Sequence, residues 1–193
     1  MRKLIVTNMI SLDGYYEGPG NNVMALPFDE GFSEYNAERL RAADTLLLGR
    51  ATYEGFRSYW PPIADDTSQP PVEREISRLN TAMDKVVVSD TLTPNQTAPW
   101  NNTEIVKRAD AHARVAALKE SPGKEIIMFG SHTLWNDLLV AGLVDELHLM
   151  IGAGVLGAGT RVFEGPAPVR LRLLESRTLP DSSLVLTRHA PAA

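Results

Sequence analysis

The chain has 193 residues, of which 44% are hydrophobic, and its 19 basic and 24 acidic side chains leave a formal net charge of −5. This size is sufficient for one hydrophobic core, so we expect a single domain over residues 1–193. The lack of cysteine excludes disulfides, thiolate zinc sites and cysteine nucleophiles. Without a long basic block, a signal sequence or an apolar stretch of roughly 20 residues, we expect a cytoplasmic protein that binds neither nucleic acid nor membrane.

Residues 3–10 are bulky and alternating, which predicts a buried strand that ends at the SLDG turn. The Gly, Pro and Asn residues of the next stretch, residues 15–22 (YYEGPGNN), predict a mobile loop in a position from which loops often cover a ligand. Asp13 is therefore either a turn carboxylate or an acid that faces the ligand. Tyr15 and Tyr16 are either ordinary packed or exposed side chains or rings that stack on a ligand.

Apolar residues at helical spacing predict a helix over residues 27–43, with Pro27 and Asp29 as start signals. Asp29 and Glu30 fall in its first turn, where carboxylates interact favourably with the helix dipole. The alternative is that one of them faces a pocket and handles a substrate proton. Residues 44–48 then predict a short, fully buried strand.

This strand stops at Gly49 and turns directly into a helix that continues to Tyr59. The junction combines free backbone N–H donors, the Arg50 guanidinium and the Thr52 hydroxyl. Helix N-termini bind anions because unpaired N–H groups and the helix dipole both favour negative charge. A nucleotide phosphate is the anion that this arrangement suits best.

Strands and helices alternate through the middle of the chain. An irregular connection at residues 60–71, which contains four prolines, separates the previous helix from a helix at 72–81 and a buried strand at 85–89. A short strand at 104–107 and a helix beyond Asp110 follow. This alternation favours a largely parallel sheet that is covered on both faces.

A second strand-to-helix junction comes later. The buried strand at residues 125–129 ends at Gly130, and Ser131, His132 and Thr133 lead into a helix. Ligands of α/β sheets bind at the carboxyl ends of the strands, and two helix N-termini there suit a pyrophosphate. Gly130 alone is also consistent with a tight turn, but its pairing with Gly49 favours a ligand site.

Residues 144–151 alternate as a strand, and a G-x-G-x-x-G match follows at Gly152, Gly154 and Gly157. A dinucleotide-binding fingerprint must open a helix, whereas residues 160–168 contain two prolines and another glycine. We therefore interpret this stretch as a flexible loop beside the site. The β-rich segments at 170–179 and 183–189 predict an antiparallel hairpin at the sheet edge.

The sequence gives no support for a metal site or a hydrolase. The four histidines lie far apart and match no metal-ligand spacing, so no metal is expected. Only His132 falls at the proposed site, where a polar residue at a helix N-terminus is the simpler explanation. No nucleophile elbow or Ser-His-Asp pattern is present.

Five segments in order resemble the dihydrofolate reductase superfamily, and within it the reductase domain of bacterial riboflavin biosynthesis, the RibD C-terminal domain. They are ISLDG, LLLGRATYEGF, KVVVSDTL, EIIMFGSHTLWNDLLVAGLVDELHLMI and VLGAGTRVFEG. The likeness covers nearly the whole chain, and GRATYE and FGSHTLWNDLLVAGLVDEL are its most specific parts. It implies a three-layer α/β fold whose mixed, mostly parallel sheet has about eight strands and ends in an antiparallel hairpin.

The resemblance also implies an NADPH-dependent reductase that passes hydride to a small heterocyclic substrate, either pterin- or folate-like or pyrimidinone-like. Arg50 would lie near the ribose 2′-phosphate, where a guanidinium suits a phosphate. The cofactor-binding residues that the motifs imply are Gly49, Arg50, Thr52, Ser89, Lys107, Gly130, Ser131 and Thr133.

Two departures from the family pattern concern the cofactor. Gly130-Ser131 stands where family members often have a Gly-Gly pair. The Ser131 side chain leaves a ligand less room to approach the backbone, but its hydroxyl can donate a hydrogen bond to a phosphate. Asp90 follows Ser89, and a carboxylate there repels a 2′-phosphate, which keeps NADH open as an alternative cofactor.

Asp29 and Asp13 are the two candidates for delivering the proton that accompanies hydride transfer. One alternative function is a dinucleotide-binding module of the same fold that acts as a sensor or scaffold without catalysis, and another is a purely structural or partner-binding protein. The apolar strands near the C-terminus and the family likeness favour a sheet-mediated homodimer.

Overall fold

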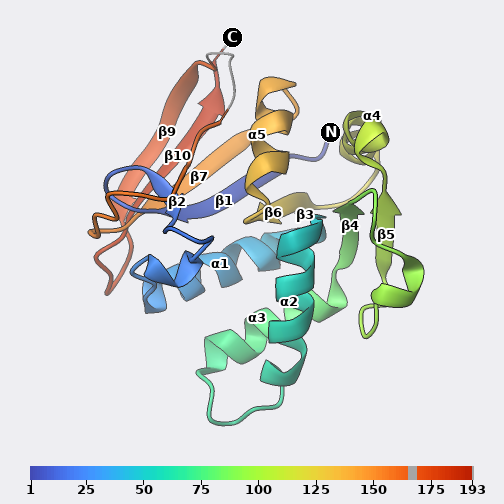
Figure 1. Cartoon of the computed structure of the whole chain (residues 1–193), viewed down its shortest axis with the longest axis horizontal. Helices are drawn as coiled ribbons and strands as arrows, with labels where there is room; N and C mark the ends of the chain where they lie inside the picture. Colours follow the sequence, from blue (N-terminus) through green and yellow to red (C-terminus); the bar gives the residue numbers. More distant parts are fainter. Residues whose placement is uncertain (165–168, 193) are drawn as a thin grey trace.

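Eight strands form one sheet in the order β5-β4-β3-β6-β1-β7-β10-β9 in the computed structural model, which describes residues 1–164 and 169–192 (Figure 1). The first six strands in this order pair in parallel, and β10 pairs antiparallel with both β7 and β9. The predicted mixed sheet with a C-terminal hairpin is therefore confirmed. The strands are β1 (Leu4–Ile10), β3 (Ala43–Gly49), β4 (Asp84–Val88), β5 (Thr103–Val106), β6 (Glu125–Phe129), β7 (Glu146–Ile151), β9 (Leu171–Thr178) and β10 (Val185–Pro191).

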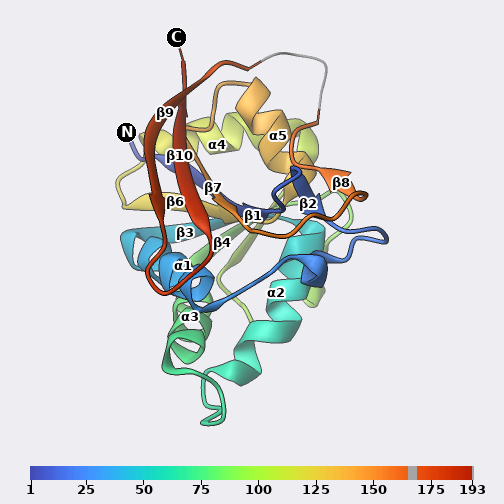
Figure 2. The same cartoon turned by 90° about the vertical axis from the view of Figure 1, so that its left-hand side faces the viewer.

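Helices cover both faces of the sheet (Figure 2). Alternation along β1 sends Leu4 and Val6 into a core with α4 and α5, and Ile5 into a core with α1, α2 and α3. The helices are α1 (Glu30–Ala42), α2 (Arg50–Ile63), α3 (Pro71–Ala82), α4 (Ala111–Glu120) and α5 (His132–Val140), with single 3-10 turns η1 (Val23–Ala25), η2 (Pro94–Gln96) and η3 (Arg108–Asp110). In the part of the chain that the structure describes, no helix is both long and apolar enough to span a membrane.

The helix that begins at Gly49 is longer than predicted, because α2 continues through Pro61 and Pro62 to Ile63. Each proline removes a backbone N–H donor, so local sequence predicts that the helix stops earlier. Tertiary contacts with α3 stabilise the last turn: Ile63 is buried, and the Ser77 hydroxyl donates to the Trp60 carbonyl at 2.6 Å.

The predicted loop at residues 15–22 contains a short strand, β2 (Tyr15–Glu17), which pairs antiparallel with β8 (Thr160–Arg161). Its partner is more than 140 residues away along the chain, so local composition could not reveal the pairing. A Cβ at Gly159 would lie 2.0 Å from the Glu17 carbonyl, so only glycine allows this approach. As predicted, the glycine-rich stretch before β8 does not open a helix.

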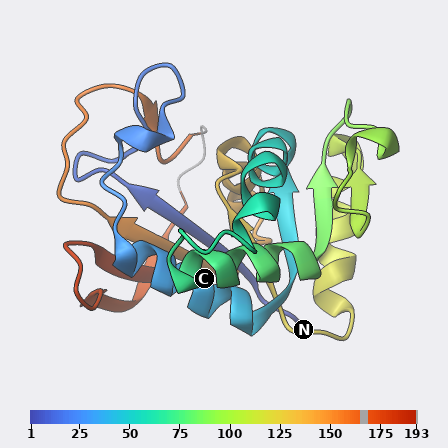
Figure 3. The ribbon, with the colours of Figure 1, turned by 90° about the horizontal axis from the view of Figure 1, so that it is seen from below.

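Because β1, β3, β4, β6 and β7 run in parallel, their carboxyl ends meet at one edge of the sheet. Figure 3 shows the blue loop after β1 and the orange segment after β7 projecting from the same end of the molecule. Both strand-to-helix junctions lie at this edge, since β3 leads into α2 and β6 leads into α5. This is the edge at which α/β sheets bind ligands.

Candidate active site

The two junctions are hydrogen-bonded to each other, and we call the pair, residues 49–52 and 130–133, the double junction. The Ser131 hydroxyl accepts a hydrogen bond from the Gly49 amide at 2.9 Å and donates to the Phe129 carbonyl at 3.1 Å. In the other direction, the Ser131 amide donates to the Thr52 hydroxyl at 2.8 Å. Two segments that are about 80 residues apart in sequence are thus fixed relative to each other.

Gly130 lies where the two halves of the double junction pack closely together. Its φ of +54° belongs to the left-handed region, and a Cβ there would lie 2.8 Å from the Thr52 hydroxyl oxygen. A side chain is therefore excluded, because Thr52 and Tyr16 already occupy its place. Ser131 has the same φ of 54°, which is unusual for a residue with a side chain. Its two side-chain hydrogen bonds compensate for that conformation.

Arg50 extends from the start of α2 toward the end of β4. Its Nε donates to Glu54 at 2.9 Å, and its Nη1 donates to the Thr91 hydroxyl. The buried Ser89 hydroxyl accepts from the amides of Thr91 and Leu92 at 3.2 and 2.9 Å, so it holds the turn that carries Thr91. The structure therefore brings Arg50 and Ser89 to one place beside the double junction.

Lys107 reaches the same turn from the end of β5, where its ammonium donates to the Asp90 carbonyl at 2.8 Å. The Asp90 carboxylate accepts from the Arg108 amide at 3.0 Å and lies 3.7 Å from the Arg108 guanidinium. Its negative charge is thus matched by a neighbouring cation. Thr91 and Arg108 were not among the predicted site residues, although the hydroxyl two residues after Ser89 and the basic pair of Lys107 and Arg108 are visible in the sequence.

Thr133 occupies the second position of α5 with its side chain exposed. Its backbone amide lies in the first helical turn, where N–H groups have no partner within the helix. The first turn of α2 offers the same kind of donors at Arg50 and Thr52. The double junction therefore presents two helix N-termini to one space, which favours a ligand with negative charge.

Asp13 fixes two loops together. Its carboxylate accepts from the Ser11 hydroxyl at 2.7 Å and from the amides of Leu156 and Gly157 at 3.0 and 2.7 Å. These hydrogen bonds, that of Ser11 foremost, lower the pKa of Asp13 to about 2. A carboxylate held in its ionised form is poorly suited to deliver a proton near neutral pH.

Asp29 is the N-cap of α1, where one carboxylate oxygen accepts from the Phe32 amide at 3.1 Å. The other oxygen accepts from the Ser182 hydroxyl, in the turn of the C-terminal hairpin, at 2.7 Å. Asp29 thus lies on the β7 and β10 side of the sheet. The structure does not join it to the double junction by any hydrogen bond among the described residues.

Tyr15 and Tyr16 pack on different partners. Tyr15 lies under the Arg161 guanidinium, 4.6 Å from its ring centre. Tyr16 stacks on the His132 ring, with ring centres 4.9 Å apart and planes inclined by 22°. Burial raises the pKa of Tyr16 to about 12. His132 is therefore part of an aromatic pair at the start of α5, and more than a polar N-terminal residue.

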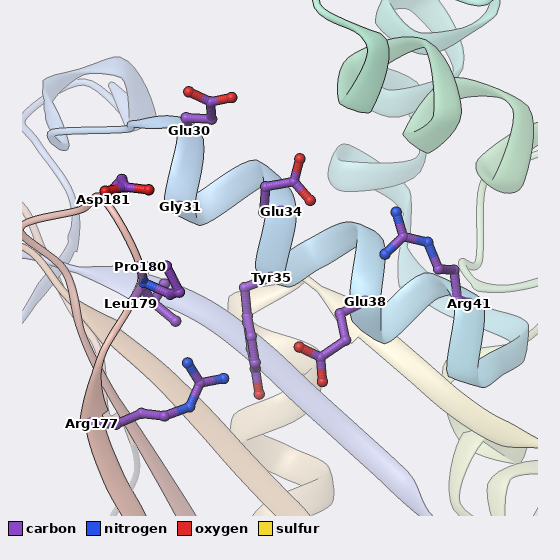
Figure 4. Close-up of a pocket in the computed structure, with 10 residues that line it drawn as sticks. All are labelled: Glu30, Gly31, Glu34, Tyr35, Glu38, Arg41, Arg177, Leu179, Pro180 and Asp181. Atoms are coloured by element: carbon purple, nitrogen blue, oxygen red, sulfur yellow. The ribbon is translucent and has the colours of Figure 1, made fainter.

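A separate hollow of about 440 Å³ lies between α1 and the C-terminal hairpin (Figure 4). Glu30, Glu34 and Glu38 line it from α1, and Arg177 points toward Tyr35 from β9. Its acidic wall disfavours an anionic ligand, so the double junction is the better candidate for a phosphate.

A buried polar cluster lies beside this hollow. The Tyr35 hydroxyl is 2.8 Å from His148 Nδ1, and His148 Nε2 is 2.9 Å from Glu146, which also accepts from Arg188 at 2.9 Å. Burial lowers the pKa of His148 to about 4. Burial opposes ionisation of Glu146, but hydrogen bonds from Lys3 and Arg188 still hold its pKa at about 2. Among the described residues, no three His, Asp or Glu side chains are placed to hold a metal ion.

The sequence matches the RibD C-terminal domain family over residues 2–185, which is almost its full length. The chain belongs to the RibD C-terminal domain family. Among curated proteins, the uncharacterized protein YyaP of Bacillus subtilis (strain 168) is 29% identical over 192 residues, which are 97% of this chain and 95% of YyaP. The resemblance inferred from the motifs is thus confirmed.

Solved structures share the RibD C-terminal domain fold. A pyrimidine reductase-like protein from Corynebacterium diphtheriae superposes with a TM-score of 0.69 at 14% identity, over 100% of this chain and 92% of that one. Dihydrofolate reductase from Enterococcus faecalis, in complex with NADP(H), superposes with a TM-score of 0.60 at 15% identity, over 99% and 97% of the two chains. The chain therefore shares its fold with these two proteins.

The residues at the double junction fit a dinucleotide phosphate. The N-termini of α2 and α5 supply unpaired amides, and Arg50 supplies a guanidinium. In a RibD-type domain these groups would bind and orient the cofactor.

Proposed function

We propose that this chain is an NADPH-dependent reductase that transfers hydride to a small heterocyclic substrate of the pyrimidinone or pterin type. The observation that carries the proposal is the hydrogen-bonded double junction at the carboxyl ends of β3 and β6, in a member of the RibD C-terminal domain family. The substrate class follows from the names of the structural neighbours, a pyrimidine reductase-like protein and a dihydrofolate reductase.

In this proposal the double junction binds the pyrophosphate, and Arg50, Ser89 and Lys107 bind the 2′-phosphate. The pairing of Asp90 with Arg108 supports NADPH over NADH, because it reduces the repulsion that an unpaired carboxylate would exert on a 2′-phosphate. When bound, NADPH supplies the hydride, while the protein positions the reactants and excludes water.

For the proton, we propose Asp29 in preference to Asp13, because Asp13 is held ionised by three hydrogen bonds. Asp29→Asn retains an oxygen that can cap α1, whereas Asp29→Ala removes the cap at a cost of about 1 kcal/mol. We expect Asp29→Asn to lose most turnover while its NADPH affinity and melting temperature stay near those of the wild type. Equal turnover in Asp29→Asn and wild type would assign Asp29 a capping role alone.

The test of the proposed function is NADPH oxidation, followed by absorbance, with a panel of pyrimidinone and pterin acceptors. We expect acceptor-dependent oxidation that is faster with NADPH than with NADH. Failure of every acceptor with a protein that binds NADPH would favour the second candidate, a dinucleotide-binding module without catalysis. That candidate is supported by one observation, namely that both acids proposed for proton transfer already serve as hydrogen-bond acceptors in the fold.

A further inference from the structure

Residues 11–17, which follow β1 and which we call the covering loop, are hydrogen-bonded to the segment around β8. Besides the bonds of Asp13 described above, the Thr160 hydroxyl donates to Glu17 at 2.8 Å and the Val162 amide donates to the Gly14 carbonyl at 3.0 Å. Figure 2 shows β2 and β8 side by side near the start of α5. The covering loop is therefore held in one position against α5.

These hydrogen bonds between the covering loop and the β8 segment hold Tyr16 at the double junction. Its ring stacks on His132, whose Nε2 donates to the Val162 carbonyl at 3.0 Å, so the supporting ring is itself fixed. The Tyr16 hydroxyl lies 3.2 Å from the point that a Cβ of Gly130 would occupy, and the Thr52 hydroxyl lies 2.8 Å from the same point. Both hydroxyls thus pack against Gly130, where the two junctions meet.

The half-buried Tyr16 hydroxyl makes no hydrogen bond with any residue that the structure describes. By contrast, the Tyr35 hydroxyl pairs with His148 at 2.8 Å and the Tyr53 hydroxyl donates to the Thr97 carbonyl at 3.2 Å. The Tyr16 hydroxyl therefore has a donor available for a ligand. Its raised pKa of about 12 keeps it protonated, and hence a donor, at neutral pH.

The strand order indicates which acceptor would reach it. Arg50 and Ser89 lie at the ends of β3 and β4, toward the β5 edge, whereas the covering loop comes from β1, on the other side of β6. A dinucleotide whose 2′-phosphate lies near Arg50 would place its second phosphate, the one on the nicotinamide side, nearest to the covering loop.

We propose that the Tyr16 hydroxyl donates a hydrogen bond to the nicotinamide-side phosphate of the bound dinucleotide, and that His132 and Asp13 position Tyr16 for this contact. The inference rests on the proposed function, since it assigns a further residue to the same cofactor site. It gives the covering loop a direct binding role in place of the acid–base role considered for Asp13.

The test compares two probes by fluorescence or calorimetric titration. NADPH carries both phosphates of the pyrophosphate, whereas adenosine 2′,5′-bisphosphate has the 2′-phosphate and only the adenosine-side phosphate. We expect Tyr16→Phe, which retains the ring and its stacking, to weaken NADPH binding by about tenfold or more, as is typical when a hydrogen bond to a charged group is lost. Its affinity for adenosine 2′,5′-bisphosphate should match that of the wild type.

Tyr15→Phe is the matched control, because the Tyr15 hydroxyl points to the Gly157 carbonyl at 3.4 Å and not to the double junction. It should bind both probes like the wild type. Unchanged NADPH affinity in Tyr16→Phe would overturn the inference, and so would tighter binding, which would mean that the hydroxyl obstructs the site. Equal losses for both probes would overturn it as well. A wild-type protein that binds neither probe would instead refute the proposed function.

The positioning role of Asp13 is tested by a double-mutant cycle. Asp13→Ala frees the covering loop from Leu156 and Gly157, so it should also weaken NADPH binding. In the Tyr16→Phe background the same substitution should cost less than in the wild type, because the contact that it positions is already absent. Fully additive losses would show that Asp13 does not act through Tyr16.

Discussion

The sharpest prediction concerns Arg50→Ala. The Nε of Arg50 donates to Glu54 and one Nη1 proton to Thr91, so the other guanidinium protons remain available for the proposed 2′-phosphate. A hydrogen bond to a charged group contributes about 1.5–3 kcal/mol, which corresponds to a roughly 10- to 150-fold loss of NADPH affinity. NADH lacks the 2′-phosphate, so its affinity should change by less than about threefold.

The loss of the Glu54 pair does not account for this effect. Arg50 and Glu54 are both more than one-third exposed and four residues apart on α2, where such a pair contributes only about 0.3–0.5 kcal/mol. Glu54→Gln is therefore the control, and it should leave NADPH affinity within about twofold of the wild type. Fluorescence titration with both nucleotides measures these constants. Equal losses for NADPH and NADH in Arg50→Ala, or no loss for NADPH, would refute the phosphate assignment.

Three further predictions concern stability and assembly. Gly130→Ala should lower the free energy of unfolding by about 1–3 kcal/mol and weaken NADPH binding, because it introduces a Cβ at positive φ against Thr52. Gly55→Ala, in open space on α2, should instead raise the free energy of unfolding by up to about 1 kcal/mol. Denaturant melts measure this contrast, and equal stabilities of the two variants would contradict it. Unfolding free energy should fall as the pH drops from 6.5 toward 4, because His148 takes up a proton mainly on unfolding, and again from 4.5 toward 2, because Glu146 is ionised in the fold. Urea melts should show a clearly smaller first loss in His148→Asn, with the part due to His189, whose pKa burial also lowers, retained. A flat wild-type profile would contradict the buried cluster. Light scattering of the wild type should give twice the 21.2 kDa chain mass. Leu173→Glu, on the exposed face of the C-terminal hairpin, should shift the protein to a monomer. A monomeric wild type would refute the homodimer.

Much of the fold could be predicted because its signals are local. Buried strands alternate with amphipathic helices, so the parallel sheet and its two Gly-to-helix junctions follow from the sequence, and parallel strands bring Gly49 and Gly130 to one edge. The segments of α2 and β2 that were mispredicted depend on distant partners. The turn at Pro61 and Pro62 is stabilised by α3, and β2 exists because β8 pairs with it.

The site was harder to predict for the same reason. Ser131 seemed to be a departure that narrows the backbone approach, whereas its hydroxyl and amide join the two junctions. Asp13 and Asp29 were chosen as acids near turns, but each also has a distant hydrogen-bond partner: Leu156, 143 residues from Asp13, and Ser182, 153 residues from Asp29. Sequence spacing identifies residue types that suit a chemistry, and only the fold shows which atoms are already engaged.

The central claim, that the double junction binds NADPH, is tested most directly by thermal unfolding with and without the nucleotide. At a free concentration of 100 times Kd, binding stabilises the fold by about 2.7 kcal/mol, which for a chain of this size raises Tm by about 5–10 °C. We predict this shift for the wild type with NADPH and a clearly smaller one for Arg50→Ala at the same concentration. A wild-type Tm that NADPH leaves unchanged at millimolar concentration would contradict the claim.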